Sequence, residues 1–206
     1  MRIGIDFDNT LVCYDQLFWK LAWEQGLIDE SIERRKNAVR DDLRRRGLEP
    51  RWTALQGEAY GGRILEALPF NGLFAGLTRL RQRGCSLFIV SHKTRFPVAG
   101  AEVDLHAAAR SWLFQQGIWD PANSGSVVQG VYFELTKIEK LQRIEQLGCD
   151  VFVDDLIELL TEPAFPTGVR RVLFDPHVEQ TTLPPGIQQL HSWENAISIL
   201  PAEMHP

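Results

Sequence analysis

The chain has 206 residues and a formal net charge of −5, with 44% hydrophobic and 24% charged residues. This composition is that of a soluble globular domain, and the length suits one domain with a small insertion. It excludes disordered, collagen-like and coiled-coil chains, and no stretch approaches the roughly 18 apolar residues of a membrane-spanning helix. The negative charge disfavours a nucleic acid duplex as a partner, and we expect no membrane interaction.

The first eight residues already contain two carboxylates, which is untypical of a secretory signal peptide. Cys13, Cys85 and Cys149 are isolated from one another, so the pattern indicates neither a disulfide framework nor a zinc site. We therefore expect a cytoplasmic protein whose cysteines serve as small buried apolar residues.

Apolar runs of five to seven residues alternate with helical patterns along most of the chain. In chain order, the sequence predicts a strand over 2–7, helices within 15–68 (the third over 52–67), a helix over 73–83, a strand over 86–90, a helix over 103–117, a strand over 127–133, a helix over 136–147, strands over 149–153 and 169–174, and a helix over 193–200. Because most of the strands are apolar on both faces, we expect an α/β fold with a Rossmann-like parallel sheet.

The block 15–68 interrupts this alternation with helices alone. We expect it to form a small all-helical insertion, with 1–14 and 69–206 forming the α/β core. Its segment 34–51 carries eight basic residues among interspersed acids. Two interpretations stay open for this segment: a solvated helix face with internal ion pairs, or a surface that attracts an anionic substrate.

Polar side chains follow the predicted strands at the edge where an open parallel sheet binds ligands. They are Asp6, Asp8, Asn9 and Thr10 after the first strand, Ser91, His92, Lys93 and Thr94 after the second, Asp154 and Asp155 after the fourth, and Lys137 at the start of the preceding helix. Crowded carboxylates repel one another unless a cation holds them, and oxygen ligands favour Mg²⁺. One of two acids spaced two residues apart can attack a substrate while the other handles the proton.

Four segments resemble, in order, the motifs of the haloacid dehalogenase-like (HAD) superfamily of aspartate-nucleophile phosphohydrolases. They are DFDNT at 6–10, IVSHKT at 89–94, ELTKIEKL around Lys137 and VFVDD at 151–155. The resemblance covers the whole chain except the helical block. That block lies between the first two motifs, where the family inserts a helical cap over its active site.

The resemblance implies a role for each matching residue. Asp6 would be the nucleophile and Asp8 the general acid/base, with Ser91 and Lys137 binding the transferring group; Lys140, one turn further on, is the alternative lysine. Magnesium would be held by Asp6, the main-chain carbonyl of Asp8, and Asp154 or Asp155. The candidates for substrate contact are Asn9, Thr10, His92, Lys93 and Arg95.

The sequence thus predicts a magnesium-dependent phosphomonoester hydrolase that acts through an aspartyl-phosphate. The expected partner is a small-molecule phosphate ester such as a sugar phosphate or nucleotide, because inserted caps usually accompany small substrates. Dehalogenase activity is disfavoured, since family members that displace halide lack an acid at the position of Asp8. Two alternatives stay open: a non-catalytic phospho-acceptor or binding module, and a phosphomutase on the same scaffold.

Overall fold

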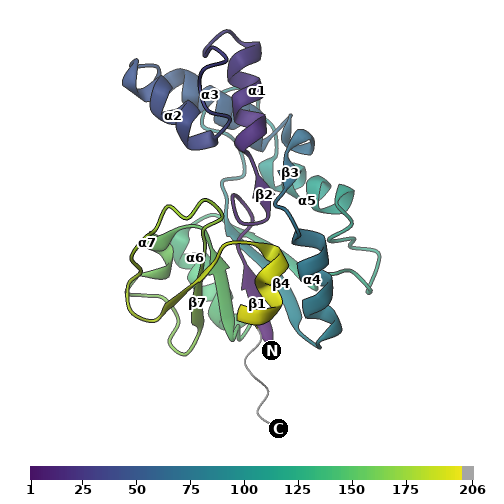
Figure 1. The fold of residues 1–206 in the computed structure, drawn as a ribbon. Helices are drawn as coiled ribbons and strands as arrows, with labels where there is room; N and C mark the ends of the chain where they lie inside the picture. The colour runs from purple at the N-terminus through teal and green to yellow at the C-terminus, as the bar shows by residue number, and fades with distance from the viewer. Residues whose placement is uncertain (201–206) are drawn as a thin grey trace. The chain divides into compact units, whose positions relative to one another are not determined.

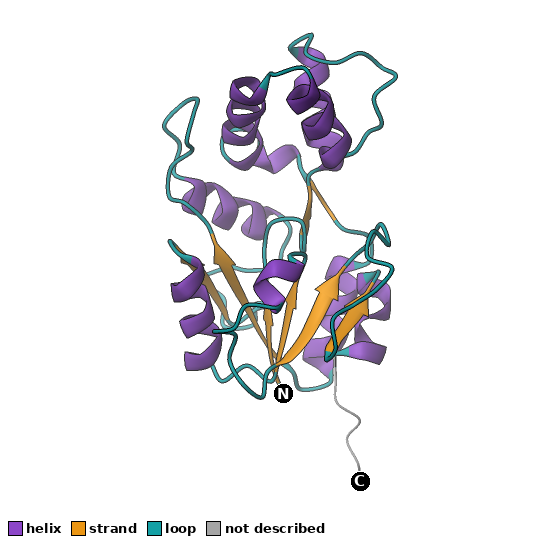
Figure 2. Ribbon diagram, turned by 90° about the vertical axis from the view of Figure 1, so that its left-hand side faces the viewer, coloured by secondary structure: helices purple, strands orange, loops and turns teal. Residues whose placement is uncertain are grey.

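A computed structural model describes residues 1–200, which contain a six-stranded parallel sheet (Figure 2). Its strand order is β5-β4-β1-β6-β7-β8, and each neighbouring pair runs parallel. The strands are β1 (Arg2–Ile5), β4 (Ser86–His92), β5 (Gly130–Glu134), β6 (Val151–Asp154), β7 (Arg170–Phe174) and β8 (Ile187–Leu190). The predicted α/β class with a parallel Rossmann-like sheet is confirmed.

Helices cover both faces of this sheet (Figure 1). On one face, α6 (Lys137–Gln146) and α7 (Ile157–Leu160) pack into an apolar cluster with Phe88 and Phe152. On the other, α4 (Leu73–Gln82) packs against the one-turn 3-10 helix Trp193–Asn195 and α8 (Ala196–Ile199). Burial on both faces explains why the strands are continuous apolar runs.

The remaining helices are α1 (Asp15–Glu24), α2 (Lys36–Arg45), α3 (Glu49–Tyr60), the 3-10 turn Ile64–Glu66 and α5 (Leu105–Gln115). The predicted third helix over 52–67 is divided, because Gly61 and Gly62 end α3 and only a short 3-10 turn follows. Three features lie outside the predicted elements: the short helix α7, the edge strand β8, and a two-stranded sheet of β2 (Val12–Cys13) and β3 (Leu68–Pro69). No helix among residues 1–200 is long and apolar enough to cross a membrane.

The contacts divide the chain into two compact units. The α/β unit contains Met1–Leu11, Pro69–Lys93 and the described residues from Gln116 onward; the helical unit contains Val12–Leu68 and Thr94–Gln115. The helical unit thus contains, besides most of the expected block 15–68, a second segment within the range 69–206 expected for the α/β core. The reason is a set of long-range contacts: the Trp112 indole donates to the carbonyl of Ala67 at 2.8 Å, and the Gln115 amide donates to that of Leu65 at 3.1 Å.

The basic segment 34–51 is largely paired with acids of its own unit. Arg44 bonds Glu49 at 2.7 Å, and the half-exposed Arg46 bonds the buried Asp42 at 2.8 Å. The helical unit as a whole carries as many acidic as basic side chains. Of the two interpretations of this segment, the structure favours the salt-bridged helix face.

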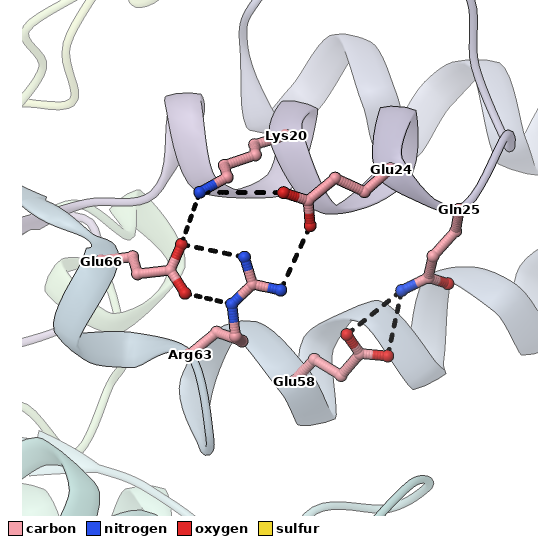
Figure 3. A network of polar contacts seen from close by, with 6 residues as sticks. All are labelled: Lys20, Glu24, Gln25, Glu58, Arg63 and Glu66. Atoms are coloured by element: carbon pink, nitrogen blue, oxygen red, sulfur yellow. Dashed lines mark hydrogen bonds and ion pairs between the residues drawn. The ribbon is translucent and has the colours of Figure 1, made fainter.

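A second ion-pair network joins α1 to Arg63 and Glu66, which lie just after α3 (Figure 3). Lys20 lies 2.8 Å from Glu66, and Arg63 bonds both Glu66 and Glu24. Glu66 accepts hydrogen bonds from Arg63 and Lys20, which lower its pKa to about 2; the contribution of Arg63 is the larger. Since this value lies below the ordinary 4.5, the network stabilises the fold above pH 4.5, and that contribution is lost as the pH falls toward 2.

Replacing Glu66 by Gln should lower the free energy of unfolding by about 0.5–1 kcal/mol at pH 7, a modest value because water and salt screen these partly exposed charges. Urea denaturation at pH 7 and at pH 3 measures this, and the difference from wild type should shrink at pH 3. Glu58→Gln is the matched control, because Glu58 bonds only the neutral amide of Gln25 in the same network view (Figure 3). Equal losses for both variants at pH 7 would contradict the prediction.

Candidate active site

Three carboxylates converge at the carboxyl ends of the adjacent strands β1 and β6. Asp6 follows β1 directly, Asp154 ends β6 and Asp155 comes next. The two strands stay paired to this point, since the Asp6 amide donates to the carbonyl of Val153 at 2.9 Å. One carboxylate oxygen from each of the three acids lies within 4.8 Å of the others. The expected convergence of the first and last acidic motifs is thus present in the structure.

A buried lysine bridges two of these acids. The Lys140 ammonium donates to Asp6 Oδ1 and to Asp154 Oδ2, both at 2.6 Å. All three side chains are nearly inaccessible to water, with Asp154 fully buried. The second oxygen of Asp154 accepts the main-chain amide of Leu156 at 2.9 Å. Lys140 therefore neutralises part of a charge cluster that would otherwise be costly to bury.

The predicted position of Lys137 at the strand ends needs correction. Lys137 is the first residue of α6; its side chain is half-exposed and pairs with Glu162 at 3.0 Å. Lys140, the alternative, occupies the position beside the acids. The signal that could have distinguished them is the phase of the helix: the buried stripe of α6 runs through Lys140, Leu141 and Ile144, at the spacing of one helix face.

The second acid of the DFDNT segment has a lysine of its own. Lys93 lies with its ammonium 2.7 Å and 3.0 Å from the two carboxylate oxygens of Asp8. The lysine is buried, and its main-chain amide donates to the main-chain carbonyl of Glu134 at 2.9 Å. About a fifth of the Asp8 side chain is accessible to water. Lys93, a candidate for substrate contact, thus has Asp8 as its partner in the structure.

Asn9 and Thr10 form the turn that follows Asp6 and Asp8 and leads into the helical block. Asn9 has a φ of 58°, a left-handed conformation that asparagine tolerates better than most residues. Thr10 is buried; its hydroxyl donates to Asp155 at a long 3.5 Å, and its carbonyl accepts the Trp193 indole at 2.8 Å. Both candidates therefore shape the loop, and Thr10 also contacts the acid cluster.

The remaining candidates separate into two groups. Ser91 is buried on β4, two residues beyond Ile89, which pairs with the last residue of β1, Ile5. His92 is exposed, and its ring bonds the carbonyl of Leu135 at 3.1 Å. Arg95 belongs to the helical unit, where it pairs with Asp104 at 3.0 Å.

The electrostatics of the cluster reflect its burial. Desolvation, together with the charges of Asp154 and Asp8, raises the pKa of Asp6 to about 7, although Lys140 acts in the opposite direction. Burial alone would lower the pKa of Lys140, but Asp154 and Asp6 raise it above its ordinary value, so this lysine stays charged. The cluster holds three carboxylates, and the Lys140 ammonium bridges two of them, so acidic groups are in excess.

This excess fits a hard divalent cation. Among residues 1–200, Asp6, Asp154 and Asp155 form the only group of three potential ligand residues close enough together to hold a metal ion. Their donor atoms are all oxygens, which is the set that Mg²⁺ prefers. Asp155 is the more accessible of the terminal pair, whereas both oxygens of Asp154 already have partners. The residues present therefore fit magnesium.

The fold of the chain is similar to that of several solved structures. A HAD-superfamily hydrolase from Geobacter sulfurreducens PCA has a TM-score of 0.57 at 14% identity (97% of this chain, 96% of that one). A HAD phosphatase from Thermococcus onnurineus has 0.53 at 16% (97% of each chain), and a dehalogenase 0.58 at 14% (97% and 96%). No protein-family model and no curated protein matches the sequence. The chain thus has the HAD fold, which phosphatases and dehalogenases share.

Proposed function

We propose that the protein is a magnesium-dependent phosphomonoester hydrolase that acts on a small phosphorylated metabolite through an aspartyl-phosphate on Asp6. The observation that carries the proposal is the buried group of Asp6, Asp154 and Lys140 with a second acid, Asp8, two residues away. A nucleophilic carboxylate, a cation-binding oxygen set and a separate acid/base group are the parts that this chemistry requires.

In the first step, a carboxylate oxygen of Asp6 would attack phosphorus, and the bond from phosphorus to the leaving oxygen would break. Asp8 would give that oxygen a proton, and in the second step it would take a proton from the water that hydrolyses the acyl phosphate. Lys140 holds Asp6 through Oδ1, which fixes the direction of the carboxylate. Magnesium held by Asp6, Asp154 and Asp155 would supply positive charge against the phosphoryl oxygens.

Asp8 is the residue that favours a phosphatase over a dehalogenase. An alkoxide leaves phosphorus readily only when it gains a proton, whereas a halide is a stable leaving group that needs none. A second acid suits the first task and has no use in the second. Lys93 bonds both oxygens of Asp8 in this structure, so one of these bonds would open when Asp8 carries the proton. The side chain stays partly accessible, as contact with a substrate requires.

A phosphate-release screen tests the proposal. The whole chain is incubated with a panel of sugar phosphates, nucleotides and p-nitrophenyl phosphate, with magnesium or with EDTA, and with 2-chloropropionate as a halide donor. We expect phosphate release with magnesium, none with EDTA, and no chloride. If no ester is cleaved and acetyl phosphate leaves a phospho-aspartate lasting minutes to hours, the protein is a phospho-acceptor; an isomeric sugar phosphate in place of phosphate identifies a mutase.

A further inference from the structure

The end of the described chain packs against α4, as the yellow ribbon shows in Figure 1. Trp193 begins the 3-10 helix in this segment and is fully buried. Its ring lies against Phe174, with the ring centroids 5.7 Å apart, and its indole N–H donates to the carbonyl of Thr10 at 2.8 Å. This bond joins residues 183 positions apart within the α/β unit, and the proposed chemistry gives Trp193 no role.

Close packing fixes the position of this indole. A Cβ atom at Gly76 would lie 2.4 Å from the carbonyl oxygen of Trp193, so only glycine lets α4 approach the tryptophan backbone this closely. The Ser192 hydroxyl caps the 3-10 helix by accepting the amide of Glu194 at 3.2 Å. The backbone is thus held against α4 and the ring against Phe174, so the N–H points in one direction.

The turn that receives this hydrogen bond carries backbone strain. Asn9 has a φ of 58°, a conformation that costs free energy for residues other than glycine. The carbonyl of Leu11 accepts the amide of Phe70 at 3.1 Å, and the Trp193 indole bonds the carbonyl before it, that of Thr10. Removing the indole N–H would leave the buried Thr10 carbonyl without this partner, and a strained turn would then shift.

Thr10 connects the turn to the candidate magnesium site. Its hydroxyl donates to Asp155 Oδ1 at 3.5 Å, the outer limit of a hydrogen bond, so a displacement of a few tenths of an ångström would break the contact. Asp155 is the acid of the terminal pair with room for a cation, because both oxygens of Asp154 have partners. Groups that bond a ligand carboxylate in this way orient it toward the metal.

We infer that Trp193 is a positioning residue that sets the magnesium affinity of the site by holding Thr10 against Asp155. This inference rests on the proposed function in taking Asp155 as a magnesium ligand. The site then reaches its full affinity only when the segment around Trp193 is docked on the α/β unit.

Removing the indole N–H tests the inference. Trp193→Phe keeps a ring against Phe174, and isothermal titration of the whole chain with Mg²⁺, without substrate, should show a dissociation constant about threefold to tenfold above that of the wild type. Trp112→Phe is the matched control, because Trp112 is also fully buried and its indole donates to a main-chain carbonyl, that of Ala67, at the same 2.8 Å. The control should keep the wild-type magnesium affinity. Equal affinities for the two variants would overturn the inference.

A double-mutant cycle tests the route through Thr10. Thr10→Val removes the hydroxyl that donates to Asp155 and should raise the magnesium dissociation constant about tenfold. Adding Trp193→Phe should raise the constant by less than a further twofold, because the hydroxyl that the indole positions is gone. Additive losses would overturn this route. If Trp193→Phe fails to fold, benzothienylalanine at position 193, with sulfur in place of the N–H, keeps the ring size and allows the same comparison.

Turnover separates this inference from the proposed function. With an ester that the wild type cleaves, Trp193→Phe should need more magnesium for half-maximal phosphate release, yet reach a kcat within about twofold of the wild type at saturating magnesium. A much lower kcat at saturation would contradict a role in magnesium affinity alone. If the wild type binds magnesium but cleaves no ester, the proposed function fails while the titrations still decide the inference. A wild type that binds no magnesium would overturn the inference itself.

Discussion

Replacing Asp6 by Asn should reduce the turnover of any phosphate ester that the wild type cleaves by about 10⁴-fold or more. The amide has nearly the same size but is a poor nucleophile, and it cannot form an acyl phosphate. The change also removes one of the crowded negative charges, while Lys140 keeps Asp154 as a partner. Thermal stability should therefore be maintained, so that the loss of activity reports chemistry rather than unfolding.

Two measurements check this prediction. Phosphate release gives kcat, and mass spectrometry of acid-quenched samples detects the phosphorylated chain, which should be present for the wild type and absent for Asp6→Asn. Asp150→Asn is the matched control, because Asp150 lies at the opposite, amino end of β6, where it accepts the amide of Arg2 at 2.7 Å. Turnover retained in Asp6→Asn would show that another residue is the nucleophile.

Replacing Lys140 by Met should lower the free energy of unfolding by about 3 kcal/mol at pH 7 without magnesium. The substitution leaves Asp6 and Asp154 buried with no ammonium between them. Protonation can relieve part of this cost. A buried carboxyl whose pKa is raised stabilises the fold at low pH and loses that contribution as the pH rises, so the penalty should be smaller at pH 5 than at pH 7.

Urea denaturation of Lys140→Met and Lys137→Met in EDTA compares two identical changes one helical turn apart. Lys137 is half-exposed and pairs only with the partly exposed Glu162, so its replacement should cost about 0.5 kcal/mol or less. Added magnesium should restore more stability to Lys140→Met than to the wild type, because the cation would supply the missing positive charge. Similar losses for both variants would contradict the assigned partners of Lys140.

The candidate site shows where sequence reasoning succeeds. Asp6 and Asp154 could be identified because each follows an uninterrupted apolar strand, and a parallel sheet brings the carboxyl ends of its strands to one edge. The choice of lysine failed because it rested on the position of Lys137 at the helix start. The buried stripe of α6, which contains Lys140, was the better guide.

Other features required contacts between distant segments. The pairing of Lys93 with Asp8 joins residues 85 positions apart, and nothing in the local pattern distinguishes it from substrate contact. The assignment of Thr94–Gln115 to the helical unit depends on the Trp112 indole and the carbonyl of Ala67. The pairing of the basic segment depends on which acids its arginines reach, as with Arg46 and Asp42.

The sequence alone determined the fold class, the parallel sheet and the edge at which the acids gather. These depend on hydrophobic periodicity and on the residue type at each strand end, which are local properties of the chain. Only the tertiary structure decided which lysine serves which carboxylate and which unit holds α5. These depend on the packing of residues far apart in the chain, which is set by burial and charge in three dimensions and leaves no periodic signal.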